Sequence, residues 1–124
     1  MKKLLAVTLF CVCIPFAYGG TLNYWTGDRY LGGVANGEPH GKGTFTWGKT
    51  ASKYVGYWKF GKKHGQGTYI HGKDSKYPGV KIVGDWKDDK PWNAKYYKAD
   101  GSVLGTYTEG KWCAGCGSTN SSST

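Results

Sequence analysis

Three histidines are the first side chains in this sequence that could do chemistry. His40 and His64 lie 24 residues apart in matching contexts, and His71 follows near the end of a predicted strand. Imidazoles can bind zinc, but a zinc site needs three or four converging ligands. We therefore interpret the matched pair as a repeated preference for histidine before a Gly-x-Gly step, and we predict neither a metal site nor a cofactor.

A second candidate is the C-x-x-C motif formed by Cys113 and Cys116. In a reducing compartment, beside a βαβ pattern, this motif would indicate redox chemistry. The sequence shows no βαβ pattern, and its N-terminus predicts export to an oxidising compartment. We predict a disulfide that closes a short loop, with free thiols or intermolecular pairing as the alternatives.

Three carboxylates, Asp85, Asp88 and Asp89, gather around one predicted turn, which raises acid–base catalysis or calcium binding as possibilities. Lys87 and Lys90 lie among them, and the ligand spacing of a calcium loop is missing. The Gly-x-Gly steps do not form a phosphate loop, because no helix follows them. The sequence offers no catalytic constellation, and we predict that the protein is not an enzyme.

Basic charge is the strongest remaining signal, since the formal net charge is +9. Lys59, Lys62 and Lys63 cluster at one predicted turn beside Tyr57 and Phe60, and we predict that these residues bind lipid or a partner. A lysine close to an anionic membrane contributes about 1 kcal/mol. Acidic glycans fit the same composition, whereas export makes nucleic acid the least expected partner. Alternatively, lysines at turns and edges only keep a flat sheet from aggregating.

The N-terminus has the layout of a secretory signal peptide over residues 1–19. Lys2 and Lys3 precede an apolar stretch at 4–16, and Ala17-Tyr18-Gly19 provides a small-x-small cleavage site. The apolar stretch is shorter than the roughly 20 residues that a spanning helix needs. We predict a secreted or periplasmic protein, with an uncleaved N-terminal anchor as the alternative and a lipoprotein as a weaker one.

A 24-residue repeat determines the elements that must position these side chains. Tyr30–Lys49 matches Tyr54–Lys73 at nine of twenty positions, and a fixed period of this length indicates a repeat architecture. In the second copy, residues 54–58 alternate as a strand, residues 60–63 form a turn and residues 64–70 return as a strand, which predicts a β-hairpin. The residues predicted to build the repeat are Tyr30, Gly32, Gly41, Gly43, Tyr54, Gly56, Trp58, Gly65, Gly67 and Trp86.

Two further copies are degenerate. The third has a strand at 82–86, a turn at 89–91 and a return strand at 92–97, with Asn93 and Lys95 where the alignment expects glycines. The fourth is a half-copy at 104–110, in which Tyr107 takes the tryptophan position. No helical period follows the signal segment, so the predicted class is all-β. Because glycine is abundant and long aliphatics are scarce, we expect aromatic rings packed on rows of glycine to supply the buried area.

The pattern Tyr54-x-Gly56-x-Trp58-x-x-Gly61-x-x-His64-Gly65-x-Gly67-x-Tyr69 resembles the MORN (membrane occupation and recognition nexus) repeat, and the similarity covers about residues 22–112. This resemblance implies consecutive β-hairpins in an elongated, twisted, single-layer antiparallel sheet. It also implies a role in binding lipid or protein. We place the repeat domain at residues 20–112, and a C-x-x-C segment with a flexible Ser/Thr-rich tail at 113–124.

The functional hypothesis from the sequence is therefore an exported, non-enzymatic repeat module that forms a peripheral binding surface for anionic lipid. The alternative is a protein-interaction or assembly scaffold in the cell envelope. The oligomeric state stays open.

Overall fold

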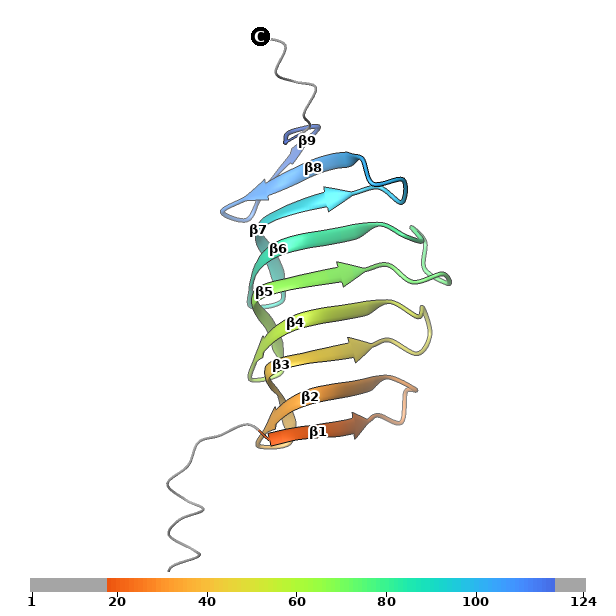
Figure 1. Ribbon diagram of the computed structural model, residues 1–124, viewed down its shortest axis with the longest axis vertical. Helices are drawn as coiled ribbons and strands as arrows, with labels where there is room; N and C mark the ends of the chain where they lie inside the picture. Colours follow the sequence, from red (N-terminus) through yellow and green to blue (C-terminus); the bar gives the residue numbers. More distant parts are fainter. Residues whose placement is uncertain (1–17, 118–124) are drawn as a thin grey trace, which may run out of the picture.

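The computed structural model describes residues 18–117, and every regular element in this part of the chain is a strand (Figure 1). The strands form one open antiparallel sheet in which each strand pairs with its neighbours in the sequence. The predicted all-β class and the consecutive hairpins are confirmed. The strands are β1 (Tyr18–Asn23), β2 (Arg29–Ala35), β3 (Glu38–Thr46), β4 (Lys53–Lys59), β5 (Lys62–Ile70), β6 (Lys81–Lys87), β7 (Lys90–Tyr97), β8 (Val103–Thr108) and β9 (Lys111–Ala114).

Two predicted segments fall largely outside the described residues. Most of the predicted signal peptide lies in residues 1–17, and most of the predicted tail lies in residues 118–124. Strand β1 begins at Tyr18, so a cleavage after Gly19 would leave Gly20–Asn23 as the first strand.

Four hairpins, β2–β3, β4–β5, β6–β7 and β8–β9, close with a two-residue turn in which both residues have positive φ. The pair is Asn36-Gly37 (φ 52° and 79°) in the first hairpin and Phe60-Gly61 (φ 47° and 79°) in the second. This geometry matches type I′ turns, whose twist suits a β-hairpin. The second turn is shorter than predicted, because Lys62 already belongs to β5. The third turn falls on residues 88–89 rather than 89–91, since the same two-residue geometry closes it.

A row of glycines crosses the sheet and supports the aromatic rings. The row contains, each opposite the next, Gly20, Gly32, Gly43, Gly56, Gly67 and Gly84. The Tyr30 ring lies over Gly43 and the Tyr54 ring lies over Gly67, so that a Cβ at either glycine would collide with the ring above it. The predicted packing of rings on glycine rows is confirmed.

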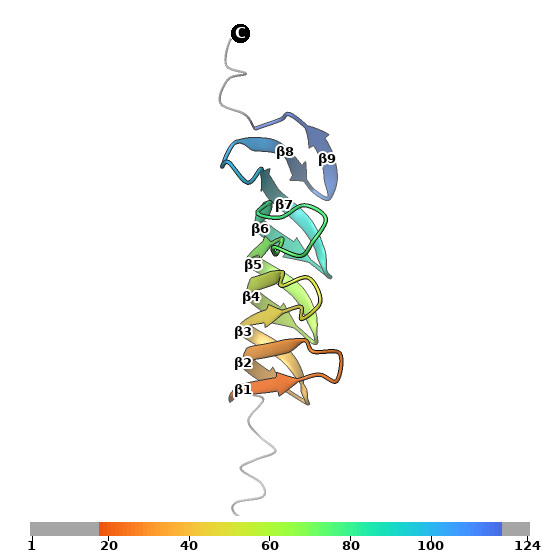
Figure 2. The same ribbon diagram turned by 90° about the vertical axis from the view of Figure 1, so that its right-hand side faces the viewer.

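The core is a column of side chains on one side of this sheet. Its buried members are Tyr30, Tyr54, Trp58, Ile82, Trp86 and Ala94. Trp58 contacts Tyr30 and Tyr54 edge-on, with ring centroids 5.6 and 5.0 Å apart, and Trp86 contacts Tyr54 in the same way at 5.2 Å. Figure 2 shows the sheet from the side as a single layer through residues 18–117. The rings therefore bury one another along the sheet instead of packing against a second layer.

The third hairpin differs from the predicted alignment by one residue. Strand β7 is one residue shorter than β5, so Ala94, rather than Lys95, lies opposite Gly84. Gly67 occupies this position in the second hairpin. Ile82 replaces the tyrosine of the earlier copies, and both Ile82 and Ala94 are buried. An isoleucine extends less far than a tyrosine ring, which leaves room for the alanine methyl group.

The fourth hairpin also departs from the prediction, because Tyr107 does not occupy the tryptophan position. Trp58 lies opposite Gly41. Tyr107 lies opposite Ala94, which occupies the position of Gly67 in the second hairpin. In the first hairpin this position is Gly43, two residues beyond Gly41. A register irregularity between β7 and β8 causes this shift. The Tyr107 ring instead packs against Trp112, with centroids 5.1 Å apart.

Candidate functional site

The two faces of the sheet differ sharply in what they offer to a partner. In β4, burial alternates one residue at a time: Tyr54, Gly56 and Trp58 are buried, while the residues between them are exposed. We call the side that carries Tyr54 and Trp58 the aromatic face, and the side that carries Val55 and Tyr57 the exposed face. Alternation of this kind follows from the two-residue period of a strand.

Uncharged side chains form a continuous row along the exposed face. The cross-strand register aligns Thr21, Leu31, Thr44, Val55, Thr68 and Val83, each opposite the next. Leu31, Val55 and Val83 are 55%, 41% and 39% exposed. We call this set the Thr/aliphatic row. It places aliphatic groups in solvent at every second strand. Within residues 18–117, no second layer covers this surface.

Basic side chains surround this row on the exposed face. Lys53 and Lys81 lie on one side of it, in register with Thr46 and Ile70. The exposed basic residues on this face are Arg29, Lys42, Lys53, Lys59, Lys62, Lys81, Lys87, Lys90, Lys95 and Lys111. A carboxylate of the same face, Asp85, accepts a hydrogen bond from Gln66. Basic side chains therefore outnumber acidic ones on the exposed face, although β1 carries no charged side chain.

Lysines of this face also gather at the tips of the hairpins. A hollow of about 760 Å³ is lined there by Lys62, Lys87, Lys90 and Trp92, together with the carboxylates of Asp88 and Glu109. The Lys87 ammonium lies 4.4 Å from the centroid of the Trp92 ring. Ammonium groups beside an aromatic ring suit an anionic group at the boundary between water and a bilayer.

Lys63 does not belong to this surface, although the sequence placed it with Lys59 and Lys62. It lies opposite Trp58, on the aromatic face. Its ammonium lies 5.5 Å from the ring centroids of Trp47 and Trp86 and 3.4 Å from an Asp89 carboxylate oxygen. The side chain is 14% exposed. Lys63 is thus held in a cage of rings with a carboxylate partner, and it is not presented to a ligand beside Lys62.

Phe60 has an unusual conformation at the tip of the second hairpin. It is 57% exposed and has a φ of 47°, a value that bulky side chains rarely adopt. Its backbone N–H donates to His40 Nδ1 at 3.2 Å, and the two rings lie 4.9 Å apart. An exposed ring at a strained backbone position makes Phe60 a candidate for contact with a ligand.

The other candidate histidines have separate surroundings. The His64 Nδ1 atom lies 3.9 Å from an Asp88 carboxylate oxygen. The His71 ring packs edge-on against Tyr69, and burial lowers the pKa of His71 below its usual value. Within residues 18–117, no three His, Cys, Asp or Glu side chains are grouped as metal ligands would be.

The buried phenols of the aromatic face are fixed in their neutral form. Burial, with a smaller contribution from Tyr24, raises the pKa of Tyr30 to about 12. Burial also raises the pKa of Tyr54, with Asp89 as a secondary cause. The Tyr30 hydroxyl donates to the Gly33 carbonyl at 2.7 Å. These groups therefore hold the fold together as neutral donors at physiological pH.

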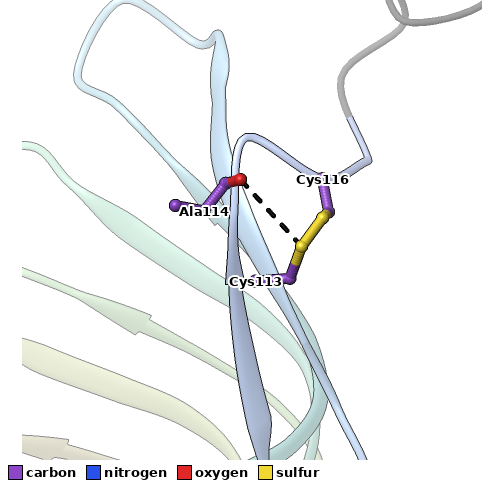
Figure 3. Close-up of a disulfide and its surroundings, with 3 residues drawn as sticks. All are labelled: Cys113, Ala114 and Cys116. Atoms are coloured by element: carbon purple, nitrogen blue, oxygen red, sulfur yellow. Dashed lines mark hydrogen bonds between the residues drawn. A yellow bond between two sulfur atoms is a disulfide. The ribbon is translucent and has the colours of Figure 1, made fainter.

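Cys113 and Cys116 form a disulfide at the end of β9 (Figure 3). The Cys113 sulfur lies 3.9 Å from the Ala114 carbonyl oxygen. The Gly115 N–H in the loop between the two cysteines donates to the Leu104 carbonyl at 2.8 Å. The disulfide thus belongs to the structure of the last hairpin.

Comparison with protein families identifies the repeat. The sequence profile of the MORN repeat matches residues 30–50 and 54–75. These segments contain most of β2 with β3, and β4 with β5. The chain contains MORN repeats. A search of curated proteins found no match to the chain.

MORN repeat proteins are generally non-catalytic modules, and the repeat supports a module that binds membrane or protein. Within the two matched segments, the MORN pattern accounts for the four central glycines of the row, Gly32, Gly43, Gly56 and Gly67, and for Tyr30, Tyr54 and Trp58 of the aromatic face. Residues 18–117 contain no helix that is long and apolar enough to cross a membrane.

The exposed face lies between the MORN positions. The sequence placed Tyr57, Lys59 and Lys62 of this face in the binding set, but it did not identify the Thr/aliphatic row. A signal was present, because Leu31 and Val55 occupy equivalent positions of two copies, as do Thr44 and Thr68. These residues alternate with the repeat tyrosines and glycines, so they point to the opposite side of the same strands.

Proposed function

We propose that this protein is an exported, non-enzymatic module whose exposed face lies on an anionic membrane surface. The observation that carries the proposal is the Thr/aliphatic row surrounded by exposed basic residues. One sheet face presents both the charges that attract anionic headgroups and the aliphatic groups that enter the interface.

The single-layer sheet has a shape that suits contact with a flat membrane surface. A single layer can lay several strands on a bilayer at once, and each lysine near the surface then contributes about 1 kcal/mol. Burying the exposed parts of Leu31, Val55 and Val83 adds roughly 25 cal/mol for each Å² of apolar surface removed from water. Phe60 lies at the hairpin tip, where an aromatic ring suits the interfacial region.

The proposed lipid-binding set differs in part from the one the sequence suggested. Tyr57, Lys59, Lys62 and Phe60 remain in it, because all four are exposed. Lys63 is left out, because its ammonium is enclosed by rings and paired with a carboxylate.

Vesicle co-sedimentation tests the proposal. The chain should pellet with phosphatidylglycerol vesicles and not with phosphatidylcholine vesicles, and the bound fraction should fall as salt rises. The double substitution Lys53→Glu/Lys81→Glu should weaken binding more than about tenfold, since it removes two attractive charges and adds two repulsive ones.

The matched control is Lys49→Glu/Lys76→Glu, which changes the net charge equally but in exposed loops outside the strands. This control should retain most of the binding. Equal losses in the two double variants would show a response to net charge alone and would contradict the proposed face. Binding to an anionic polysaccharide but to no vesicle would replace lipid by an acidic glycan as the ligand.

The export that we propose has its own test. After expression from the full sequence, the mature chain should be recovered outside the cytoplasm with Gly20 as its first residue, as mass spectrometry of the intact protein can measure. Recovery of the chain from the cytoplasm with its first nineteen residues attached would contradict export.

The second candidate function is an assembly scaffold in the cell envelope. The open sheet favours it, because β1 and β9 each have one side that no strand of residues 18–117 covers. Capture of the same envelope protein by the wild-type chain and by Lys53→Glu/Lys81→Glu, without vesicle binding, would support the scaffold over the lipid module.

A further inference from the structure

The second hairpin holds a cation of its own on the aromatic face. Four rings surround the Lys63 ammonium, with centroids 5.5 to 5.9 Å away: Trp47, Tyr54, Tyr69 and Trp86. An Asp89 carboxylate oxygen lies 3.4 Å from the same ammonium. Ring faces attract a cation, and the attraction grows when the site is partly desolvated. We call this arrangement the Lys63 cage.

The first hairpin has no lysine at the matching position. Pro39 precedes Lys63 by 24 residues, and each takes the same place in the register of its hairpin. The residue before it also differs, since Glu38 stands where the second hairpin has Lys62. Two basic residues of the second copy are thus replaced by one acidic and one uncharged residue in the first.

The rings of the Lys63 cage do recur in the first hairpin. Phe45 corresponds to Tyr69, which follows it by 24 residues. Tyr24 corresponds to Trp47, because each follows a glycine of the row by four residues. The Tyr24 and Phe45 centroids lie 5.6 Å apart, and those of the corresponding pair lie 5.2 Å apart. The first hairpin therefore has a similar ring arrangement without the internal cation.

A hollow of about 500 Å³ lies among these residues. Its lining includes Tyr24, Trp25, Asp28, Glu38, Pro39 and Phe45. None of the described residues that line it is basic. All of them follow the proposed cleavage site, so the mature chain keeps the hollow. Its volume lies in the range of small-molecule sites.

Two carboxylates make the hollow acidic in a chain whose formal net charge is +9. Glu38 forms no ion pair within residues 18–117. Asp28 accepts hydrogen bonds from the Gly48 N–H and the Thr26 hydroxyl, both at 2.9 Å, which fixes its position in the loop. Burial, followed by the charges of Asp28 and Glu38, raises the pKa of Tyr24 above its usual value. Both carboxylates therefore act on the Tyr24 ring.

Trp25 adds an accessible ring to this hollow. It is 96% exposed, so burial in the fold does not explain an indole at this position. The backbone of its loop is ordered by two hydrogen bonds, from the Tyr24 N–H to the Asp28 carbonyl at 3.0 Å and from the Gly27 N–H to the Tyr24 carbonyl at 2.9 Å. Tryptophan is the ring that attracts cations most strongly.

We propose that this hollow binds a primary alkylammonium ion, whose ammonium group takes the place that the Lys63 ammonium takes in the second hairpin. The first hairpin supplies the rings and the carboxylates of such a cage, and Pro39 contributes no charge of its own. The third hairpin does not offer a second site of this kind. It also has a proline at this place, Pro91, but the hollow beside Pro91 is lined by Lys63 itself, which repels a cation.

NMR spectra of the backbone amides and indole N–H groups test the proposal on the mature chain. The probe is n-butylammonium chloride, which has the length of a lysine side chain, with sodium chloride at the same concentration as the control. The Trp25 indole resonance should shift with a dissociation constant on the order of 1 mM. Neutral n-butanol should bind at least about tenfold more weakly. Equal binding of n-butanol, or no shift of the Trp25 resonance well above that concentration, would overturn the proposal.

Glu38→Gln separates the site from the net charge. It removes one of the two carboxylates at nearly constant shape, so the dissociation constant should rise about fivefold. Glu109→Gln is the matched control, because it removes the same charge from the hollow that is lined by three lysines. It should leave the affinity unchanged. Equal losses in the two variants would show a response to net charge alone and would overturn the proposal.

Pro39→Lys should block the site from within. Its ammonium would enter the hollow as Lys63 enters its cage, so n-butylammonium should bind at least about tenfold more weakly. Thr44→Lys, the matched control, adds the same charge to the exposed face of the same strand and should leave the affinity unchanged. A folded Pro39→Lys chain that binds like the wild type would show that the proposal is wrong. If the NMR spectrum of Pro39→Lys shows an unfolded chain, Glu38→Gln decides.

A free amine and a lysine side chain of a peptide present the same ammonium group. A pentapeptide with a central lysine between glycines that binds at least about tenfold tighter than n-butylammonium would identify peptide lysine as the source. Equal or weaker binding of the peptide would identify a free amine.

This site and the membrane surface fail separately. Vesicle binding without a response to n-butylammonium would remove the ammonium site and leave the membrane proposal intact. A response to n-butylammonium without vesicle binding would do the reverse.

Discussion

Alternate residues of the same strands form the aromatic face and the exposed face, but close packing restricts the residue types only on the aromatic face. On the aromatic face, a tyrosine ring over a glycine leaves no space for an added carbon atom. On the exposed face, Thr, Leu and Val follow one another across the sheet without a covering layer. The repeated residues therefore build the sheet, whereas the residues between them face solvent, where a ligand can contact them.

The largest expected effect comes from a methyl group added under a ring. Gly67→Ala should lower the free energy of unfolding by about 3 kcal/mol, because the new Cβ collides with the Tyr54 ring. Gly20→Ala, at the matching position of β1, should change it by less than about 1 kcal/mol, since that glycine carries no ring. Urea unfolding followed by tryptophan fluorescence measures both. Equal destabilisation of the two variants would show that a ring above the glycine does not determine the cost of the added methyl group.

Alkaline pH should lower the stability of the fold, because it deprotonates the buried tyrosines of the aromatic face. Because the pKa of Tyr30 is raised by burial to about 12, its neutral form is favoured in the folded state. The stability that this shift represents is complete below the unfolded pKa of about 10 and is lost as pH rises toward 12. The midpoint of urea unfolding should therefore fall between pH 10 and 12. Tyr30→Phe should show a shallower fall, and an unchanged slope would contradict the role of Tyr30.

Substitutions of two neighbouring lysines should have opposite effects on stability and on vesicle binding, because the two side chains lie on opposite faces. Lys63→Met should lower stability by about 1 kcal/mol, because it removes a partly desolvated cation from its rings and leaves the Asp89 carboxylate with only the backbone N–H of residue 63 as a partner. It should leave vesicle affinity within about twofold, as Lys63 is not presented to the bilayer. Lys62→Met should do the reverse, with stability unchanged and affinity for anionic vesicles about fivefold weaker. If both variants behave alike, the assignment of Lys63 to the aromatic face is wrong.

The smallest effect concerns the hairpin tip. Phe60→Asn should stabilise the fold by about 0.5 kcal/mol, because asparagine adopts positive φ more easily than phenylalanine does. The same change should weaken vesicle binding, since it removes an exposed ring. Thermal unfolding and co-sedimentation of one preparation give both numbers. A variant that is less stable than the wild type would refute the account of strain at residue 60.

The repeat made most of the aromatic face predictable. The 24-residue match located the hairpins, and Tyr54 with Gly67 indicated rings lying on glycine. Two details could not be read in this way. The loss of one residue from β7 moved Ala94 into a glycine position, and the shifted register of β8 took Tyr107 away from the tryptophan position. Both depend on bulges, which add or remove a residue without altering the residue types.

The candidate site was harder to predict, because proximity in sequence was mistaken for proximity in space. Lys62 and Lys63 are adjacent, but successive residues of a strand point to opposite faces. The alternation could be applied to Lys62 and Lys63 only after the turn had been assigned to residues 60 and 61, which makes both lysines part of a strand. Leu31 and Val83 are far apart in sequence, and only the strand pairing places them in one row.

Environment-sensitive fluorescence at two single positions shows whether the exposed face enters the bilayer. A nitrobenzoxadiazole label on Val55→Cys lies on the exposed face, and the same label on Tyr77→Cys lies in the exposed loop before β6. The account predicts a blue shift and increased emission from position 55 when phosphatidylglycerol vesicles are added, with little change at position 77. A shift at position 77 without one at position 55 would contradict the account.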